Sequence, residues 1–175
     1  MPINITPLTL DQGAAELKYC DSYSRLPTLL NIAWRMDNSD WLTLLGDMWS
    51  ICDNLGLYID DWFDTPFGDR QEDCPIVEMM TPDELAAYEA LPSICTVYRG
   101  CYKINKRGLS WSLSRQVAER FPTLNRYCQQ DQPLLVKAVV KKEKIAAVKL
   151  DRNETEIITF WPKHISTSYI RIQKG

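Results

Sequence analysis

The sequence predicts an α+β fold, because helical patterning fills the first half of the chain and short β-rich segments fill the second. The change falls between Pro92 and Ser93, and the charge changes at the same place. Residues 1–92 carry four basic and seventeen acidic side chains, whereas residues 93–175 carry sixteen basic and six acidic ones. Nothing at the boundary has the composition of a flexible linker. We therefore expect one domain over residues 1–175, with an acidic helical layer packed on a basic β core.

Apolar residues recur at helical spacing through the first half. Thr9 followed by Gln12 predicts a capping box that opens a helix running to about Cys20. Two further helices are predicted from the sets Leu26, Leu29, Leu30, Ala33, Trp34 and Trp41, Leu44, Leu45, Met48, Cys52, Leu55, the second with Ser39 or Asp40 placed to cap it. A loop over residues 60–75 follows, and then a helix that begins with Thr81-Pro82 and ends near Pro92.

The second half contains short segments rich in β-branched or aromatic residues, which predict strands. These segments are Ile94–Arg99, Leu134–Val140, Lys144–Leu150, Thr155–Trp161 and Ser168–Ile172. One short helix interrupts them: Ser114 is placed to cap it, and Val117, Ala118 and Phe121 form its apolar face. Trp34, Trp41, Trp49 and Trp62 in the helical half are expected to pack in the core.

Composition excludes several classes of protein. No apolar run approaches the ~20 residues of a membrane span, and the N-terminus lacks the pattern of a secretory signal, so we expect a soluble, cytoplasmic protein without a membrane partner. The six cysteines form no C-x-x-C pair and the single histidine is His164, so no zinc site is predicted and the thiols are expected to be reduced. Glycine-rich dinucleotide and phosphate-loop motifs are absent. The basic stretch 141–144 is interpreted as a solvated turn, and no direct contact with nucleic acid is expected.

The first polar segment of interest is Val97–Gly100. Arg99 ends an apolar strand and places a fixed cation beside the open backbone of Gly100. A guanidinium fork suits phosphate oxygens, and a glycine lets a flat ring approach the main chain. The alternative is a solvent-exposed arginine before a turn glycine.

Two more polar segments follow. Alternation puts Ser110, Ser112 and Ser114 on one side of a short strand, where Ser110 and Ser112 either face water or orient a neighbouring polar group. Glu154 and Glu156 point the same way at the start of a later strand, so their charges repel. Such a pair is either solvated at a sheet edge or used together.

Three features follow one another along the chain: a strand arginine, a Ser-Trp-Ser strand that leads into a helix with A-x-x-F, and an E-x-E at the start of a strand. Together and in this order, they resemble the R-S-E class of ADP-ribosyltransferases. The segments YRGC, GLSWSLS, AERF and RNETEII are similar to small ADP-ribosyltransferase-like proteins of phages and bacterial mobile elements. The resemblance covers residues 93–160. It implies the split β-sheet core of that class, NAD⁺ as a substrate bound by the basic half, and no metal.

The resemblance also implies roles for individual residues. Arg99 would hold the phosphate or ribose on the nicotinamide side of NAD⁺, and the backbone of Gly100 would bind the carboxamide. Ser110 would position Glu156, the catalytic glutamate that bonds the ribose hydroxyl. Glu154 would lie on the acceptor side, an arrangement that goes with arginine as acceptor.

The sequence departs from the class at two points. Trp111 stands between Ser110 and Ser112 where threonine is typical, so Trp111 either faces the core or shapes the NAD⁺ pocket with Ser112. Pro122 ends the helix early, which leaves open whether the nicotinamide stacks on Tyr102, Phe121 or Tyr127.

The expected activity is mono-ADP-ribosylation of a host protein, with arginine as the acceptor. For a phage-encoded protein the expected target is a nucleic-acid-binding defence complex, as in an anti-CRISPR protein, and a toxin acting on an essential host protein fits as well. Two alternatives stay open. One is a non-catalytic acidic inhibitor that occupies a nucleic-acid-binding groove, and the other is an NAD⁺ glycohydrolase.

Overall fold

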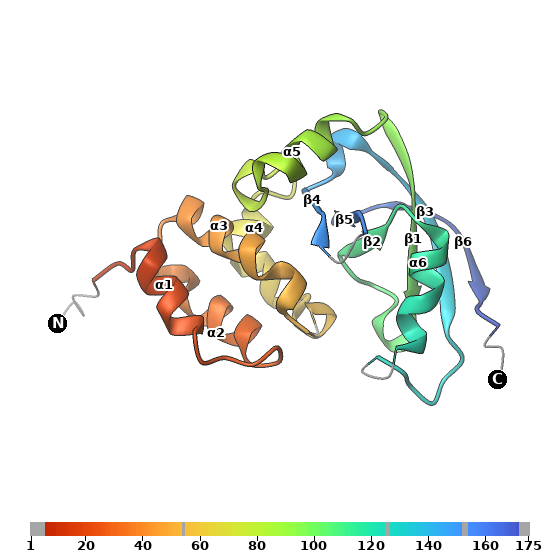
Figure 1. Cartoon of the computed structure of the whole chain (residues 1–175), viewed down its shortest axis with the longest axis horizontal. Coiled ribbons are helices and arrows are strands. Elements are labelled where there is room, and N and C mark those ends of the chain that lie inside the picture. The colour runs from red at the N-terminus through yellow and green to blue at the C-terminus, as the bar shows by residue number, and fades with distance from the viewer. Residues whose placement is uncertain (1–5, 54, 125–126, 152–153, 172–175) are drawn as a thin grey trace. The chain divides into compact units, whose positions relative to one another are not determined.

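The computed structural model describes residues 6–53, 55–124, 127–151 and 154–171. The described residues form an α+β protein and divide into two compact units between Thr81 and Pro82 (Figure 1). The sequence had placed the charge boundary eleven residues later, at Pro92. The helix between the two boundaries thus belongs with the sheet. In the part of the chain that is described, no helix is long and apolar enough to cross a membrane.

The first unit is helical, as predicted. Its α-helices are α1 (Leu10–Leu17), α2 (Arg25–Ile32), α3 (Asn38–Met48) and α4 (Pro66–Asp69). Short 3₁₀ turns connect them: η1 (Ala33–Arg35), η2 (Trp49–Ile51), η3 (Leu55–Tyr58), η4 (Asp61–Asp64) and η5 (Val77–Met79). The helix α4 lies inside the segment 60–75 that was predicted to be a loop.

Capping side chains fix where these helices begin. The predicted capping box at α1 is confirmed, since Thr9 accepts from the Gln12 amide and the Gln12 side chain accepts from the Thr9 amide. At α3 the prediction of Ser39 or Asp40 as the cap was wrong. Asp37 caps this helix by accepting from the Ser39 amide at 2.9 Å, because the helix begins two or three residues earlier than the apolar periodicity alone indicates.

Aromatic side chains form the centre of the first unit. Trp49, Trp62 and Phe67 pack against one another with ring centroids 5.3–5.8 Å apart, and Trp41 is fully buried. Three of the four tryptophans expected in the core are therefore there. Trp34 is the exception, with 64% of its surface exposed. It lies in η1, where the helical spacing used to predict its burial no longer applies.

The second unit is a six-stranded antiparallel sheet with two α-helices. Its strands are β1 (Ile94–Cys101), β2 (Ser110–Ser112), β3 (Leu134–Lys141), β4 (Ala147–Lys149), β5 (Glu156–Ile158) and β6 (Lys163–Tyr169). They are arranged in the order β4-β5-β2-β1-β3-β6. The helices are α5 (Pro82–Glu89) and α6 (Arg115–Arg120). The 3₁₀ turn η6 (Lys103–Asn105) follows β1, η7 (Phe121–Thr123) follows α6, and η8 (Lys142–Lys144) follows β3.

The last strand differs from its prediction. The sequence placed a strand at 168–172, whereas β6 begins at Lys163 and pairs with β3 along its length. The ladder shifts register between Lys137 and Ala138, and every residue of β6 is exposed. Without a buried face, β6 has no alternation of apolar and polar residues from which its bounds could be inferred.

Each helix of the second unit packs on the sheet through one specific contact. In α5, Glu84 forms a buried ion pair with Lys149 of β4, with Oε2 and Nζ 2.8 Å apart. In α6, capped by the Ser114 hydroxyl as predicted, the Ala118 carbonyl lies against the α-carbon of Gly100 in β1, and a side chain there would overlap it. Gly100 therefore sets how closely α6 approaches the sheet.

Candidate functional site

The second unit contains a cavity where β1, β2, the start of β5 and α6 meet. All three polar segments singled out in the sequence reach it. Its lining residues are Tyr98, Arg99, Gly100, Ser110, Trp111, Ser112, Val117, Ala118, Phe121, Glu154 and Glu156. Arg152 and Asn153, which belong to the RNETEII motif, lie outside the described residues.

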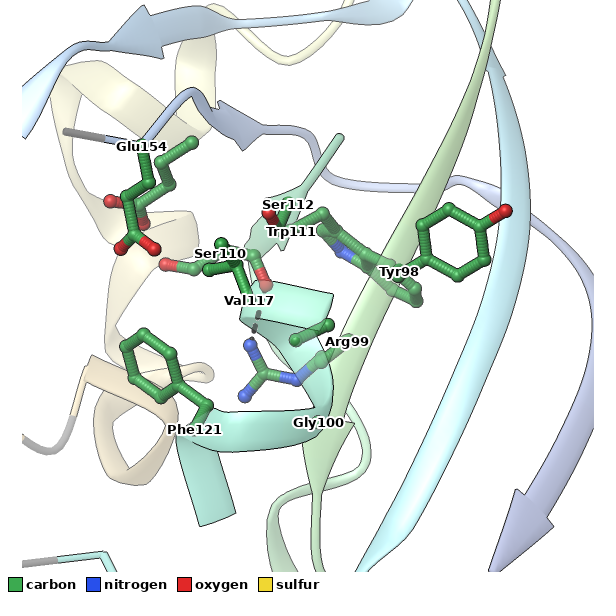
Figure 2. A pocket seen from close by; sticks show the side chains of 11 residues that line it. Tyr98, Arg99, Gly100, Ser110, Trp111, Ser112, Val117, Phe121 and Glu154 are labelled. Carbon is green, nitrogen blue, oxygen red and sulfur yellow. Dashed lines mark hydrogen bonds between the residues drawn. The ribbon is translucent and has the colours of Figure 1, made fainter. Parts of the chain in front are cut away.

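Arg99 lies where β1 and β2 separate. In the described ladder the two strands pair at Tyr98 and Ser112. Beyond that point the Arg99 guanidinium bridges the strands by donating to the Ser110 carbonyl at 2.7 Å (Figure 2). It also donates to the carbonyl of Asn105 in η6 at 3.2 Å. An arginine side chain thus replaces the backbone hydrogen bonds that continued pairing would make.

The surroundings keep the Arg99 charge in one place. The guanidinium rests against Gly108, where any side chain would collide with it. Within the described residues, its buried Nε has no hydrogen-bond partner. Burial lowers the pKa of Arg99, while the nearby Cys101 and Glu156 act in the opposite direction. An arginine remains protonated under such shifts, so the cavity has a fixed positive charge in its wall.

The strand register places Glu156 within a row of polar side chains. Glu156 is directly opposite Ser112 of β2 on one side and Lys149 of β4 on the other, and Ser112 is opposite Tyr98. Residues directly opposite each other in an antiparallel pair share a face of the sheet. Ser110 is opposite Ile158, so it is a diagonal neighbour of Glu156, and Ser112 is the direct one.

Glu154 also belongs to the cavity. Figure 2 shows the Glu154 carboxylate on the same side of the cavity as the Ser110 side chain and the Phe121 ring. The two carboxylates of the Glu-x-Glu pair therefore line one cavity and are half-buried. Of the two readings open in the sequence, a fully solvated pair at a sheet edge does not fit this position.

Trp111 has a packing role between the two serines. It is 7% exposed, stands opposite the buried Ile157, and donates from its indole nitrogen to the Gly108 carbonyl at 3.0 Å. Trp111 thus faces the core and also forms part of the cavity wall. The Ser112 hydroxyl accepts from the Ser114 amide at 3.0 Å, which links the strand to the start of α6.

The aromatic candidates occupy different positions. Phe121 lines the cavity, and Tyr127 stacks on Phe121 with centroids 5.2 Å apart and planes tilted by 22°. Tyr102 is buried and donates its hydroxyl proton to the Pro122 carbonyl at 2.7 Å. In this geometry Phe121 presents a ring to the cavity, Tyr127 supports that ring, and Tyr102 fixes the turn behind it.

Three further residues that line the cavity, and one neighbour of Glu156, were not singled out in the sequence as site residues. Tyr98 and the pair Val117 and Ala118 line the cavity, and Lys149 is the cross-strand neighbour of Glu156. The alternation of β1 and the apolar face of α6 were visible in the sequence and carried a signal for the first three. Lys149 had none, because its position depends on which strand pairs with β5.

Among the described residues, no group of three or more His, Cys, Asp or Glu side chains is arranged to hold a metal ion. The arrangement instead offers a fixed cation, two carboxylates, hydroxyl groups and an aromatic ring around one cavity. No protein-family model, curated protein or solved structure matches this chain.

Proposed function

We propose that the chain is a mono-ADP-ribosyltransferase that cleaves NAD⁺ at its nicotinamide bond and transfers ADP-ribose to an arginine of a host protein. The observation that carries the proposal is the meeting of Arg99, Ser110 and Glu156, from three separate strands or strand ends, in the wall of one cavity. Glu154 and Phe121 line the same cavity. The likeness of residues 93–160 to ADP-ribosyltransferases is an expectation from the sequence, and the grouping of these side chains around one cavity supports it.

In the proposed reaction, a negatively charged side chain faces a ribose that becomes positively charged. The bond between the ribose C1′ and the nicotinamide nitrogen breaks, and its electron pair neutralises the cationic ring nitrogen. The ribose then carries oxocarbenium-like positive charge, as in glycoside hydrolysis, and the carboxylate of Glu156 stabilises it. An acceptor nitrogen bonds to C1′ and gives up a proton. The role proposed for Glu154 is to orient that acceptor from the same side of the cavity.

Arg99 and Phe121 are proposed to hold the substrate. The Arg99 charge is fixed by the two carbonyls that its guanidinium contacts, which suits a phosphate or ribose oxygen that needs the same charge before and after the reaction. The Phe121 ring, supported by Tyr127, suits stacking on the nicotinamide. Gly100 has its α-carbon against α6, so any role in binding the carboxamide would fall to its backbone polar groups.

The first unit is proposed to recognise the target. Residues 1–81 carry fourteen acidic and four basic side chains, a charge that attracts a basic protein surface at long range. Proteins that bind nucleic acids present such surfaces. In a phage-encoded protein the target would be a host defence complex in the cytoplasm, and a toxin directed at an essential host protein would use the same chemistry.

Intact-protein mass spectrometry of a host lysate tests this function. The lysate is incubated with isotopically labelled NAD⁺ and substoichiometric protein, and the expected result is a labelled adduct of one ADP-ribose on a host protein. Glu154→Gln should reduce the adduct and spare nicotinamide release, whereas Glu143→Gln, an exposed residue of η8, should change neither. Release of free ADP-ribose without any adduct would identify a glycohydrolase instead.

The charge of the first unit favours a second candidate, a non-catalytic inhibitor that imitates nucleic acid. Such an inhibitor acts at one molecule per target and needs no NAD⁺. Titration of target activity in the absence of NAD⁺ separates the two functions. Full inhibition at a one-to-one ratio without NAD⁺ would support the inhibitor and contradict the transferase.

A further inference from the structure

The side of the second unit beyond α6 carries a set of cations that the candidate site does not use. A cleft between α6 and the edge strand β6 is lined by Arg115, Gln116, Glu119, Arg120, Thr123, Ser168, Tyr169, Ile170 and Arg171. Figure 1 shows α6 in front of β1 and β3, with β6 at the outer edge of the sheet. The register connects the two, because Gly100 under α6 is opposite Leu135, and Leu135 is opposite Ser168.

The same face of the sheet adds two lysines. Lys137 of β3 is opposite Tyr98 and Ser166, and Lys163 of β6 is opposite Val139. Lys137 and Lys163 therefore lie on the face of the sheet that α6 covers at Gly100. This follows because register partners share a face and every second residue of a strand returns to that face. We call the set Arg115, Arg120, Lys137, Lys163 and Arg171 the basic face.

Most of this charge is not neutralised. Arg115 pairs with Glu119 at 2.9 Å on the exposed side of α6. Within residues 82–124, 127–151 and 154–171, no carboxylate forms an ion pair with Arg120, Lys137, Lys163 or Arg171. Arg120 and Arg171 line the cleft itself, and Lys137 and Lys163 extend the positive charge along β3 and β6, so this side of the unit attracts an extended anionic ligand.

The other groups of the cleft indicate which anion. Tyr169 also lines the cleft and has 62% of its surface exposed; it follows Ser168 in the edge strand, so its ring is open to a ligand that reaches around that edge. The Ser168 and Thr123 side chains add hydroxyl groups to the wall. Arginine forks that bind phosphate, together with an exposed ring on which a base can stack, are the features with which proteins hold single-stranded nucleic acid. An acidic peptide would use the cations and leave the ring without a partner.

We infer that the basic face binds single-stranded nucleic acid along the α6–β6 cleft, with phosphates on Arg120, Arg171 and the strand lysines and a base on Tyr169. This goes beyond the proposed transferase activity and does not require it. It also departs from the expectation that the chain makes no direct contact with nucleic acid. That expectation rested on the stretch 141–144, which is indeed a turn at η8, whereas the basic face is assembled from residues distant in sequence.

Fluorescence anisotropy with the full chain and a labelled oligonucleotide of about 20 nucleotides, as oligo-U or oligo-dT, tests this inference. At about 50 mM salt the protein should bind, and log K should fall linearly with log salt. Arg120→Gln combined with Arg171→Gln should weaken binding about 10-fold or more and reduce the salt slope by about 1.4. Lys103→Gln with Lys106→Gln removes the same charge from exposed positions outside the face and should leave Kd within a few-fold.

Further variants keep the test independent of folding and of general charge. Lys137→Gln with Lys163→Gln should also weaken binding, which covers the case in which the arginine variant does not fold. Tyr169→Ser should weaken binding about 5-fold or more and Tyr169→Phe should not, because the stacking ring remains. Absence of binding at low salt, equal losses in the Lys103 and Lys106 control, or tighter binding of a poly-glutamate peptide would overturn the inference.

Discussion

The Arg99 guanidinium donates a hydrogen bond to the carbonyl oxygen of Ser110 across 2.7 Å, at the point where β1 and β2 separate. Two of the residues singled out in the sequence are thereby joined directly, through the backbone of one and the side chain of the other. The same contact holds the strand that leads to Ser112, which stands opposite Glu156. Arg99 thus shapes the cavity in addition to charging it.

Replacing Arg99 should therefore affect both stability and substrate binding. Arg99→Lys keeps the charge and loses the fork, so one of the carbonyls of Ser110 and Asn105 loses its donor, at a cost of about 1–3 kcal/mol. Urea unfolding should show this loss, and the KM for NAD⁺ should rise more than kcat falls. Unchanged stability together with a loss confined to kcat would contradict the double role.

Gly100→Ala should displace α6 from the sheet. The new methyl group would overlap the Ala118 carbonyl, which belongs to helical backbone and cannot turn aside. We expect a loss of about 1–3 kcal/mol, typical of overpacking, together with reduced NAD⁺ cleavage because Phe121 and Val117 move with the helix. Thr96→Ala, at an exposed position of the same strand, is the control in thermal unfolding. Equal melting temperatures for the two variants would show that α6 has room to move.

The ion pair of Glu84 and Lys149 should behave as a unit. The two side chains are only 7% and 4% exposed, and Glu84 also accepts from the Leu150 amide at 3.2 Å. Removing one partner, as in Lys149→Met, takes the cation away from the buried Glu84 carboxylate and should cost about 3–5 kcal/mol, whereas Lys149→Met with Glu84→Leu should cost much less. Double-mutant analysis of urea unfolding measures the difference. Additive losses would mean that the two charges are independently solvated.

Cys52 and Cys128 should differ in reactivity with pH. Burial raises the pKa of the Cys52 thiol to about 11, whereas Cys128 is exposed. Since the thiolate is the nucleophile, iodoacetamide should modify Cys128 and spare Cys52 near neutral pH, as followed by peptide mass spectrometry. The raised pKa also means that this thiol's contribution to stability is present below the ordinary thiol pKa and declines as the pH rises toward 11. Equal alkylation rates would show that Cys52 is accessible.

The sequence predicted those parts of the fold that local chemistry determines. The caps Thr9 and Ser114 and the strand β3 were recognisable because capping side chains and β-branched runs act over a few residues. The edge strand β6 was misplaced because it has no buried face. The sequence predicted one domain with a change of charge after Pro92, whereas the described chain divides into two units eleven residues earlier, because compactness groups α5 with the sheet.

The sequence selected residues that line one cavity, but it did not give their arrangement in that cavity. Arg99, Ser110, Glu154 and Glu156 could be selected from residue type and order alone, and they line one cavity. Strand register places Ser112 of β2 directly opposite Glu156 on one side of β5, and it places Lys149 of β4 opposite Glu156 on the other side. Register is set by long-range pairing, and a single sequence gives no measure of it at strands of three residues.

Nicotinamide release from saturating NAD⁺ by the unaltered chain and by Glu156→Gln tests the account most directly. The substitution keeps the shape of the side chain and removes its charge. Turnover should fall on the order of 10²- to 10³-fold, while NAD⁺ affinity measured by calorimetry should stay within a few-fold. A Glu156→Gln protein that releases nicotinamide at nearly the rate of the unaltered chain would contradict the central claim that this carboxylate stabilises a cationic ribose.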